Sequence, residues 1–198
     1  MADAGRVVAG SAGGIRLAAP GAGTRPLADR VKQTLFGVLE PDLVGAHVLD
    51  LFAGSGAAGI EALSRGAAAA VFVERDATAV RTIEANLERT HLGTAGRVVR
   101  GEALGYLRDR AAGDGPFDVA IVDPPYADPE LLRRALELLG DPGRPILSPS
   151  ARVVAKHFWR DAPPARSGLL ASERVRRFGE TALTFYRVAL EGTEVEAG

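Results

Sequence analysis

The feature that most constrains the fold is an alternation of short apolar runs with amphipathic stretches along residues 48–155. Strands are expected at 48–51, 70–73, 97–100, 117–122 and 151–155, and helices at 57–65, 77–90, 103–111 and 129–139. Strands separated by helices of this length pair in parallel, because the chain must cross a face of the sheet before the next strand forms. The pattern therefore predicts a doubly wound α/β sheet that binds ligands at the carboxyl ends of its strands.

The two ends of the chain extend this plan. Segments 175–178 and 181–188 are expected as an antiparallel pair, which brings the mostly parallel sheet to seven strands. Near the N-terminus, segments 6–10 and 14–17 flank a glycine-rich turn and predict a small β-hairpin, and a helix is expected from Asp29 to Pro41. We therefore expect three regions: a hairpin extension, the main domain and a flexible acidic tail, at 1–28, 29–190 and 191–198.

Composition bounds the functions that such a chain can have. A length of 198 residues suits one domain, and no apolar run approaches the roughly 18 residues that a membrane span needs. The chain has no cysteine, and its three histidines are scattered, so no metal site is expected. A cytoplasmic protein, acting as a monomer away from membranes, fits these features.

The first strand is followed by a glycine loop, in which Gly54, Gly56 and Gly59 form a G-x-G-x-x-G motif. Glycines permit a tight turn and let a ligand approach the backbone closely. Glu74 ends the second strand, where a carboxylate can accept hydrogen bonds from both hydroxyls of a ribose. These features alone suit either a nicotinamide dinucleotide or S-adenosylmethionine (SAM).

Two acids favour SAM over a dinucleotide. Asp50 lies four residues before Gly54, where its charge would repel a pyrophosphate but attract the ammonium and sulfonium groups of SAM. Glu102, after the third strand, could accept a hydrogen bond from an adenine amino group. Each acid on its own could instead be a helix cap or a solvated loop residue, but Asp50, Glu74 and Glu102 together follow three consecutive strands.

The segment Asp123-Pro124-Pro125-Tyr126 follows the fourth strand and suits chemistry on the amine of a nucleobase. Such an amine is a poor nucleophile, because its lone pair is delocalised into the ring. Asp123 and the carbonyl of Pro124 can accept its hydrogen bonds, the two prolines stiffen the loop, and Tyr126 can stack on the base. Taken alone, the same four residues could be no more than a turn that ends a strand.

The chain resembles the RsmD-type family of bacterial 16S rRNA methyltransferases, from about Arg6 to Val188. The resemblance is carried by five blocks, of which the second is the most specific to the family: 6–10, 25–36, 50–67, 74–76 and 123–126. It implies a Rossmann-like, SAM-dependent methyltransferase that modifies the N2 amine of one guanine, at position 966 in the customary rRNA numbering. The base would have to be flipped out of its stack first.

The resemblance also implies roles for particular residues and for partners. Asp123, Pro124, Pro125 and Tyr126 would be catalytic. The SAM site would comprise Asp50, Phe52, Gly54, Ser55, Gly56, Glu74, Arg75, Gly101, Glu102 and Ala103. Phosphate contacts are expected from Arg6, Arg16, Arg25, Arg30 and Lys32, with the helix that carries Arg30 covering the SAM site. The expected partner is 16S rRNA in an assembled or partly assembled small subunit.

Three other functions fit parts of the sequence. A DNA adenine-N6 methyltransferase would use the same Asp-Pro-Pro-Tyr chemistry, but such enzymes need an added module to recognise a duplex, and only the hairpin region is available. A dinucleotide-dependent oxidoreductase would explain the glycine motif and leave residues 123–126 without a role. A non-catalytic RNA-binding protein that retains SAM would explain the fold without any turnover.

Overall fold

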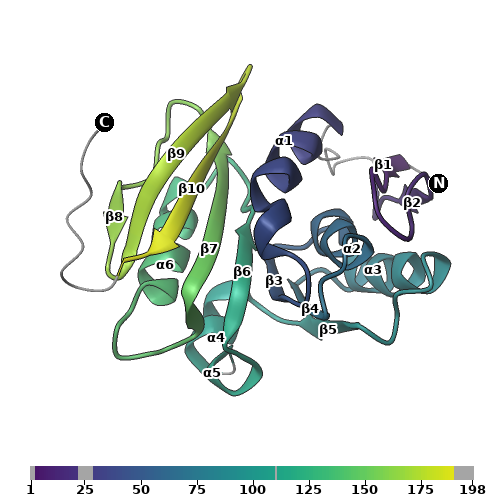
Figure 1. Cartoon of the computed structure of the whole chain (residues 1–198), viewed down its shortest axis with the longest axis horizontal. Coiled ribbons are helices and arrows are strands. Elements are labelled where there is room, and N and C mark those ends of the chain that lie inside the picture. The colour runs from purple at the N-terminus through teal and green to yellow at the C-terminus, as the bar shows by residue number, and fades with distance from the viewer. Residues whose placement is uncertain (1–2, 22–28, 110, 190–198) are drawn as a thin grey trace.

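The computed structural model of the chain describes residues 3–21, 29–109 and 111–189. A two-stranded hairpin comes first, and a sheet with helices on both faces follows (Figure 1). The strands are β1 Asp3–Arg6, β2 Arg16–Ala18, β3 His47–Leu51, β4 Ala69–Glu74, β5 Gly96–Arg100, β6 Phe117–Val122, β7 Leu147–Phe158, β8 Arg166–Ser167, β9 Leu170–Phe178 and β10 Thr181–Val188. The α-helices are α1 Asp29–Leu39, α2 Ala57–Ser64, α3 Ala77–Arg89, α4 Ala103–Asp109, α5 Ala111–Asp114 and α6 Pro129–Leu139; a 3₁₀ turn, Glu40–Asp42, follows α1.

The main sheet has the strand order β5-β4-β3-β6-β7-β10-β9-β8. Its first five strands are parallel, and β10 and β9 are antiparallel to their neighbours. The chain moves outward from β3 to β5, and then returns to the other side of β3 to form β6. Strand order therefore reverses between β3 and β6, and the carboxyl ends of this pair are where such sheets bind ligands.

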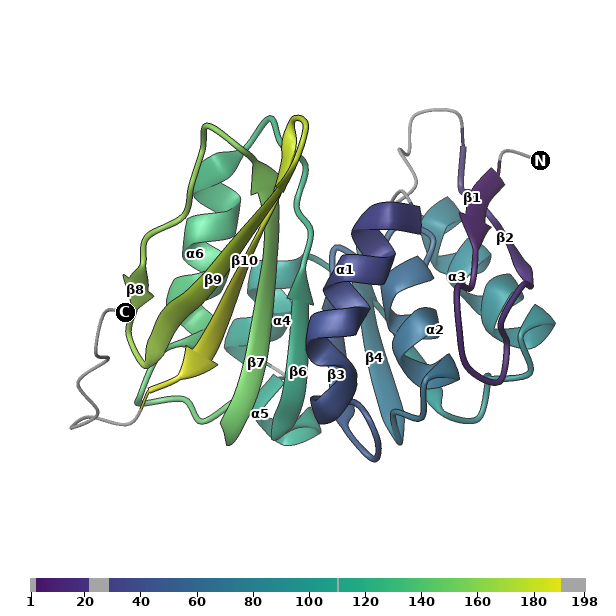
Figure 2. The same cartoon turned by 45° about the horizontal axis from the view of Figure 1, so that its top comes forward.

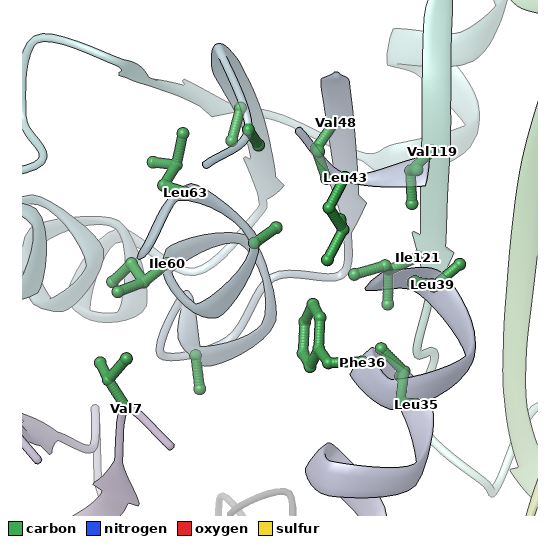
Figure 3. Close-up of a cluster of buried hydrophobic side chains, with 14 of the residues drawn as sticks. Val7, Leu35, Phe36, Leu39, Leu43, Val48, Ile60, Leu63, Val119 and Ile121 are labelled. Carbon is green, nitrogen blue, oxygen red and sulfur yellow. The ribbon is translucent and has the colours of Figure 1, made fainter. Parts of the chain in front are cut away.

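Alternate residues of the strands fill two separate cores. Val48, Phe72 and Ile121 point to one face and pack against α1, α2 and α3, while Leu49 and Val122 point to the other and pack against α4 and α6. Figure 3 shows side chains from α1, α2, β3 and β6 meeting in the first core. These strands are apolar on both sides because helices cover both faces of the parallel region.

The predicted fold class is confirmed, and several boundaries differ. The sheet has an eighth strand, β8, whose two residues are too few to give an alternating pattern. The single helix expected at 103–111 is instead α4 and α5. The hairpin strands are β1 and β2 rather than 6–10 and 14–17. The expected acidic tail, 191–198, lies outside the described residues. None of the helices in the described part of the chain is long and apolar enough to span a membrane.

The N-terminal hairpin is fixed to the main domain by buried polar groups of α2. Glu61 is completely buried and accepts hydrogen bonds from the N–H groups of Val8 (2.6 Å) and Ala9 (3.0 Å), which explains why these residues do not continue a strand ladder. Ser64 donates to the carbonyl of Ala9 at 2.6 Å. Gly10 lies so close that a Cβ atom there would be 1.8 Å from the Ser64 carbonyl oxygen. The hairpin therefore packs on α2 as part of the first core.

We predict that Glu61→Ala destabilises the protein by about 3 kcal/mol, because it leaves two partly buried N–H groups of the hairpin and the guanidinium of Arg65 without their acceptor. Urea unfolding followed by circular dichroism measures this loss. Glu84→Ala, on the exposed side of α3, serves as the control and should change stability by less than about 0.5 kcal/mol. Equal effects of the two substitutions would contradict the role given to Glu61.

Candidate active site

The glycine loop joins β3 to α2 with three residues at positive φ: Phe52 (63°), Gly54 (57°) and Gly56 (76°). A positive φ is unusual for an aromatic residue, and such strained backbone tends to occur at functional sites. Gly59, one turn into α2, has a different role. A Cβ atom there would lie 2.3 Å from the ring of Phe72 on β4, so glycine allows α2 to pack directly against the sheet.

Asp50 lies at the end of β3 and is buried under this loop. Its carboxylate accepts a hydrogen bond from the N–H of Gly59 at 2.8 Å. Burial raises the pKa of Asp50 from 3.8 to about 8; the Gly59 hydrogen bond opposes this rise, and the charges of Asp123 and Glu74 add to it. A cation bound nearby would favour the ionised form and offset part of the cost of burying it.

The ends of β4 and β5 provide the next acids. The carboxylate of Glu74 accepts hydrogen bonds from the N–H of Gly54 (2.9 Å) and of Asp76 (2.9 Å), so its orientation is fixed by the glycine loop. Glu102, which directly follows the turn after β5, is exposed and pairs with Arg75 at 3.7 Å. Glu74 is therefore held in a single position, whereas Glu102 and Arg75 are both free to move toward a ligand.

The residues 123–126 leave the end of β6 and contact β7 and β10. The ammonium of Lys156 on β7 donates to the carboxylate of Asp123 at 2.6 Å and lies 5.0 Å from the centre of the Tyr126 ring. The hydroxyl of Tyr126 shares a hydrogen bond of 2.8 Å with that of Thr181, and its ring lies 6.4 Å from that of Phe158. Both the acid and the aromatic ring of this segment are thus fixed by neighbouring strands.

Burial and the ion pair act in opposite directions on this acid. Burial raises the pKa of Asp123, and the charge and hydrogen bond of Lys156 lower it in part. Burial lowers the pKa of Lys156, but Asp123 and Tyr126 outweigh that effect, so its pKa is raised. Lys156 therefore stays protonated at neutral pH and favours the ionised form of Asp123.

These groups surround one cavity of about 830 Å³ at the carboxyl ends of β3, β4, β5 and β6. All four residues of the segment 123–126 line it, and so does every expected SAM residue except Gly56, which instead begins α2. Val31 of α1 also lines the cavity, together with Pro20 and Gly21, so α1 covers part of it as expected. Within the described residues, the charged lining comprises two cations, Arg75 and Lys156, and the carboxylates of Asp50, Glu74, Asp76, Glu102, Asp123 and Glu180.

The described residues among those expected to bind phosphate lie outside this cavity, and they differ in their ion pairs and exposure. Arg6 pairs with Asp29 at 3.3 Å and Arg16 with Asp3 at 2.5 Å, while Arg30 is exposed on α1. The expectation for Lys32 is wrong: its side chain is buried, and its ammonium donates to the carbonyl of Arg6 and pairs with Asp29. Arg25 lies outside the described residues.

Sequence reasoning missed Lys156, Thr181 and Asn86. Lys156 follows the apolar run 153–155 at the carboxyl end of a parallel strand, the same position that identified Asp50 and Asp123, and only two lysines occur in the chain. Asn86 is buried on α3, where it donates to the carbonyls of Ala18 and Ser55, each at 2.9 Å. It thereby connects the hairpin to the glycine loop, and a single polar residue on a helix gave no indication of this.

Comparison with known proteins identifies the family. The family described as "Conserved hypothetical protein 95" matches residues 5–187. The chain belongs to this family. Ribosomal RNA small subunit methyltransferase D of Escherichia coli is 35% identical over 94% of this chain and 91% of its own length, so the resemblance found in the sequence is confirmed. The YlbH protein of Bacillus subtilis is 37% identical over 92% of this chain and 98% of its own length.

Solved structures agree with the fold. The yhhF protein of Escherichia coli has a TM-score of 0.82 at 32% identity, covering 93% of this chain and 97% of that one. An RNA methyltransferase of Salinibacter ruber, solved with S-adenosyl-L-homocysteine, has a TM-score of 0.62 at 17% identity, covering 87% and 99% of the two chains, and shows the likeness of fold alone.

The cavity of this chain fits SAM as its cofactor. Its acidic lining suits a ligand that carries an ammonium and a sulfonium, and it would repel the pyrophosphate of a dinucleotide. Asp50 accepts a hydrogen bond from the N–H of Gly59 and Glu74 from that of Gly54, so both carboxylates lie against the glycine loop. Glu102 lines the same cavity just beyond the end of β5. SAM is the cofactor that the cavity, the fold and the family support together.

We predict that Asp50→Asn stabilises the protein at alkaline pH. Between pH 3.8 and about 8 the folded protein retains a proton on Asp50 that the unfolded chain releases, so the free energy of unfolding falls as the pH rises through this window. Asparagine can still accept from Gly59 and cannot ionise, so the variant should melt above the wild type by a margin that grows from pH 5 to about pH 8.5. Thermal melting across pH measures the difference.

The exposed Asp109→Asn on α4 is the control for that comparison, since no buried charge is removed. Its melting curve should follow the wild type at every pH. If the melting temperatures of Asp50→Asn and the wild type differ by the same amount at every pH from 5 to 8.5, Asp50 is ionised throughout and the raised pKa is wrong.

Proposed function

We propose that the protein transfers the methyl group of SAM to the exocyclic N2 amine of one guanine, of the position 966 type, in 16S rRNA. The observation that carries the proposal is the placement of Asp123 and Tyr126 across the same cavity from Asp50 and Glu74. One side of the cavity has the acids suited to the cofactor, and the other has an acceptor and an aromatic ring suited to a base. When bound, SAM supplies an electrophilic methyl group.

The residues of the segment 123–126 then position the amine. The carboxylate of Asp123 and the carbonyl of Pro124 accept its two hydrogens, which directs the nitrogen lone pair out of the ring system and toward the methyl carbon. Tyr126 stacks on the base, and its bond to Thr181 keeps the ring from rotating. The amine becomes acidic as the N–C bond forms, so its proton leaves after transfer without a strong base.

Lys156 supports this step through Asp123. A protonated carboxylic acid would offer a hydrogen where the amine also offers one, so the step needs the ionised form. The ammonium at 2.6 Å favours that form in a site where burial opposes it. We assign Lys156 as a positioning residue, because it acts on the substrate through Asp123.

The base must leave its stack to reach the cavity, since an exocyclic amine inside a paired helix cannot be approached in line. We propose a single-stranded or flipped guanine within an assembled or partly assembled small subunit, a monomeric enzyme and a cytoplasmic location. The name of the Escherichia coli relative, a small subunit methyltransferase, supports the small-subunit substrate. A DNA adenine-N6 methyltransferase has less support, because the hairpin that would have to recognise a duplex is packed on α2.

The function is tested with small subunits from a strain that lacks the enzyme. The purified protein and labelled SAM are added, and the modified nucleotide is mapped by mass spectrometry. One methyl group per subunit on guanine N2 supports the proposal. Labelling of plasmid DNA in place of subunits would support the adenine alternative, and no transfer to either would contradict a methyltransferase role on these substrates.

We predict that Asp123→Ala abolishes methyl transfer, with a decrease in kcat of about a thousandfold or more, because the amine loses its charged acceptor. The variant should still fold and bind SAM, since the contacts of Asp50 and Glu74 remain. Transfer to small subunits is measured in single turnover, and SAM binding by calorimetry. Appreciable transfer by this variant would contradict the catalytic role of Asp123.

We predict that Lys156→Met moves the acidic limb of the kcat profile to higher pH by about one unit or more. Lys156 lowers the pKa of Asp123, so its removal lets burial raise that pKa further, and a higher pH is needed to ionise the acceptor. Lys156→Arg keeps the charge and should leave the limb close to that of the wild type. A Met variant that loses activity equally at every pH would contradict the electrostatic role.

A further inference from the structure

The acidic cavity cannot hold the phosphates that flank a flipped base, so the RNA backbone needs a basic surface beside the cavity. One such surface lies at the turn between β9 and β10. Glu180 and Thr181 of this turn line the cavity, and Thr181 pairs with Phe158 at the end of β7. Figure 2 shows the turn projecting at the edge of the sheet where β6 and β7 end.

This surface is built around Trp159, the only tryptophan of the chain. The backbone N–H of Trp159 donates to the carbonyl of Glu180 at 3.0 Å, which places Trp159 beside a residue that lines the cavity. The guanidinium carbon of Arg177 lies 3.6 Å from the centre of the Trp159 ring, and that of Arg160 lies 4.8 Å from it. The ring of Phe158 lies 6.3 Å from Trp159 and 6.4 Å from Tyr126, so aromatic side chains lead from the surface to the base site.

The arginines of this surface have no acid partner in the part of the chain that the structure describes. Among the described residues, none of Arg160, Arg176 and Arg177 has a carboxylate oxygen within 4.0 Å, whereas Arg6 and Arg16 of the N-terminal hairpin each have one. All three are exposed. Arg177 donates from Nε to the carbonyl of Gly179 at 3.0 Å, which leaves its two terminal amino groups available.

We propose that Arg160 and Arg177, which lie on the ring of Trp159, together with Arg176, the neighbour of Arg177 on β9, bind the RNA phosphates next to the methylated base. A planar guanidinium that already lies on an aromatic ring loses little conformational freedom when it binds a phosphate in a bidentate manner. Together with Arg174 these arginines outnumber the nearby Asp161 and Glu180, so the surface has a net positive charge. The inference rests on the proposed function, because it assumes an RNA substrate whose base enters the cavity.

The test compares the double variant Arg176→Ala/Arg177→Ala with the wild type on undermethylated small subunits. At about 0.15 M salt the KM for subunits should rise about tenfold, with kcat and SAM affinity within about twofold of the wild type. The slope of log KM against log salt concentration should decrease in magnitude by about one to two, because each lost phosphate contact lowers it by about one. The matched control Arg6→Ala/Arg16→Ala should change KM less than threefold.

Trp159→Leu tests the stacked arrangement of the arginines separately from their charge. It removes no charge, so the salt slope should stay at the wild-type value while KM rises about threefold or more. Melting temperature and SAM binding establish that each variant is folded, and the single Arg176→Ala provides a second measurement if Arg177 proves important for folding. An unchanged KM in all of these variants, or a larger effect of the hairpin control, would overturn the assignment.

Failure of this inference differs from failure of the proposed function. If the wild type methylates subunits and the variants do so with the same KM and salt slope, the phosphate surface is wrong while the enzyme assignment stands. If the wild type methylates no RNA, the proposed function itself fails.

Discussion

The pairing of β3 with β6 determines where the functional groups of this protein lie. The helices that follow these two strands lie on opposite faces of the sheet, α2 on one and α6 on the other. The carboxyl ends of β3 and β6 are therefore left uncovered. Asp50 lies near the end of β3 and Asp123 just beyond the end of β6. The N–H of Asp123 donates a hydrogen bond to the carbonyl of Leu51 at 3.4 Å. The cofactor side and the base side of the cavity are thus held in register by the sheet itself.

The buried acids of this cavity lower the stability of the folded protein when they are ionised. Burial raises the pKa of both Asp50 and Asp123, and the acids also repel one another. The two carboxylates have different partners: Asp123 accepts from the ammonium of Lys156, whereas among the described residues Asp50 accepts only from the N–H of Gly59. A carboxylate without a cationic partner is suited to receive a positively charged ligand, and one with a partner is suited to remain ionised as an acceptor.

Much of this site could be predicted from sequence, because its residues follow apolar runs at the ends of parallel strands. Asp50, Glu74 and Asp123 can be identified in this way, and Lys156, which the sequence analysis misses, obeys the same rule directly after the strand expected at 151–155. Long-range polar contacts could not be predicted: a buried Glu61 or Asn86 has no periodic pattern, and the hairpin and loop residues that it contacts are 31 to 68 residues away in the chain. Lys32 was misplaced for the same reason, since burial depends on tertiary packing.

The contacts of the N-terminal hairpin indicate a different role from the one that its arginines suggested. Asn86 bonds to Ala18 of the hairpin and to Ser55 of the glycine loop, so movement of the hairpin would disturb the cofactor side of the cavity. A segment that fixes the glycine loop is poorly suited to adapt to RNA, and its exposed arginines are already paired. The β9–β10 turn is free of that constraint and adjoins the base side. We therefore propose that the antiparallel end of the sheet recognises the substrate and that the hairpin supports the cofactor site.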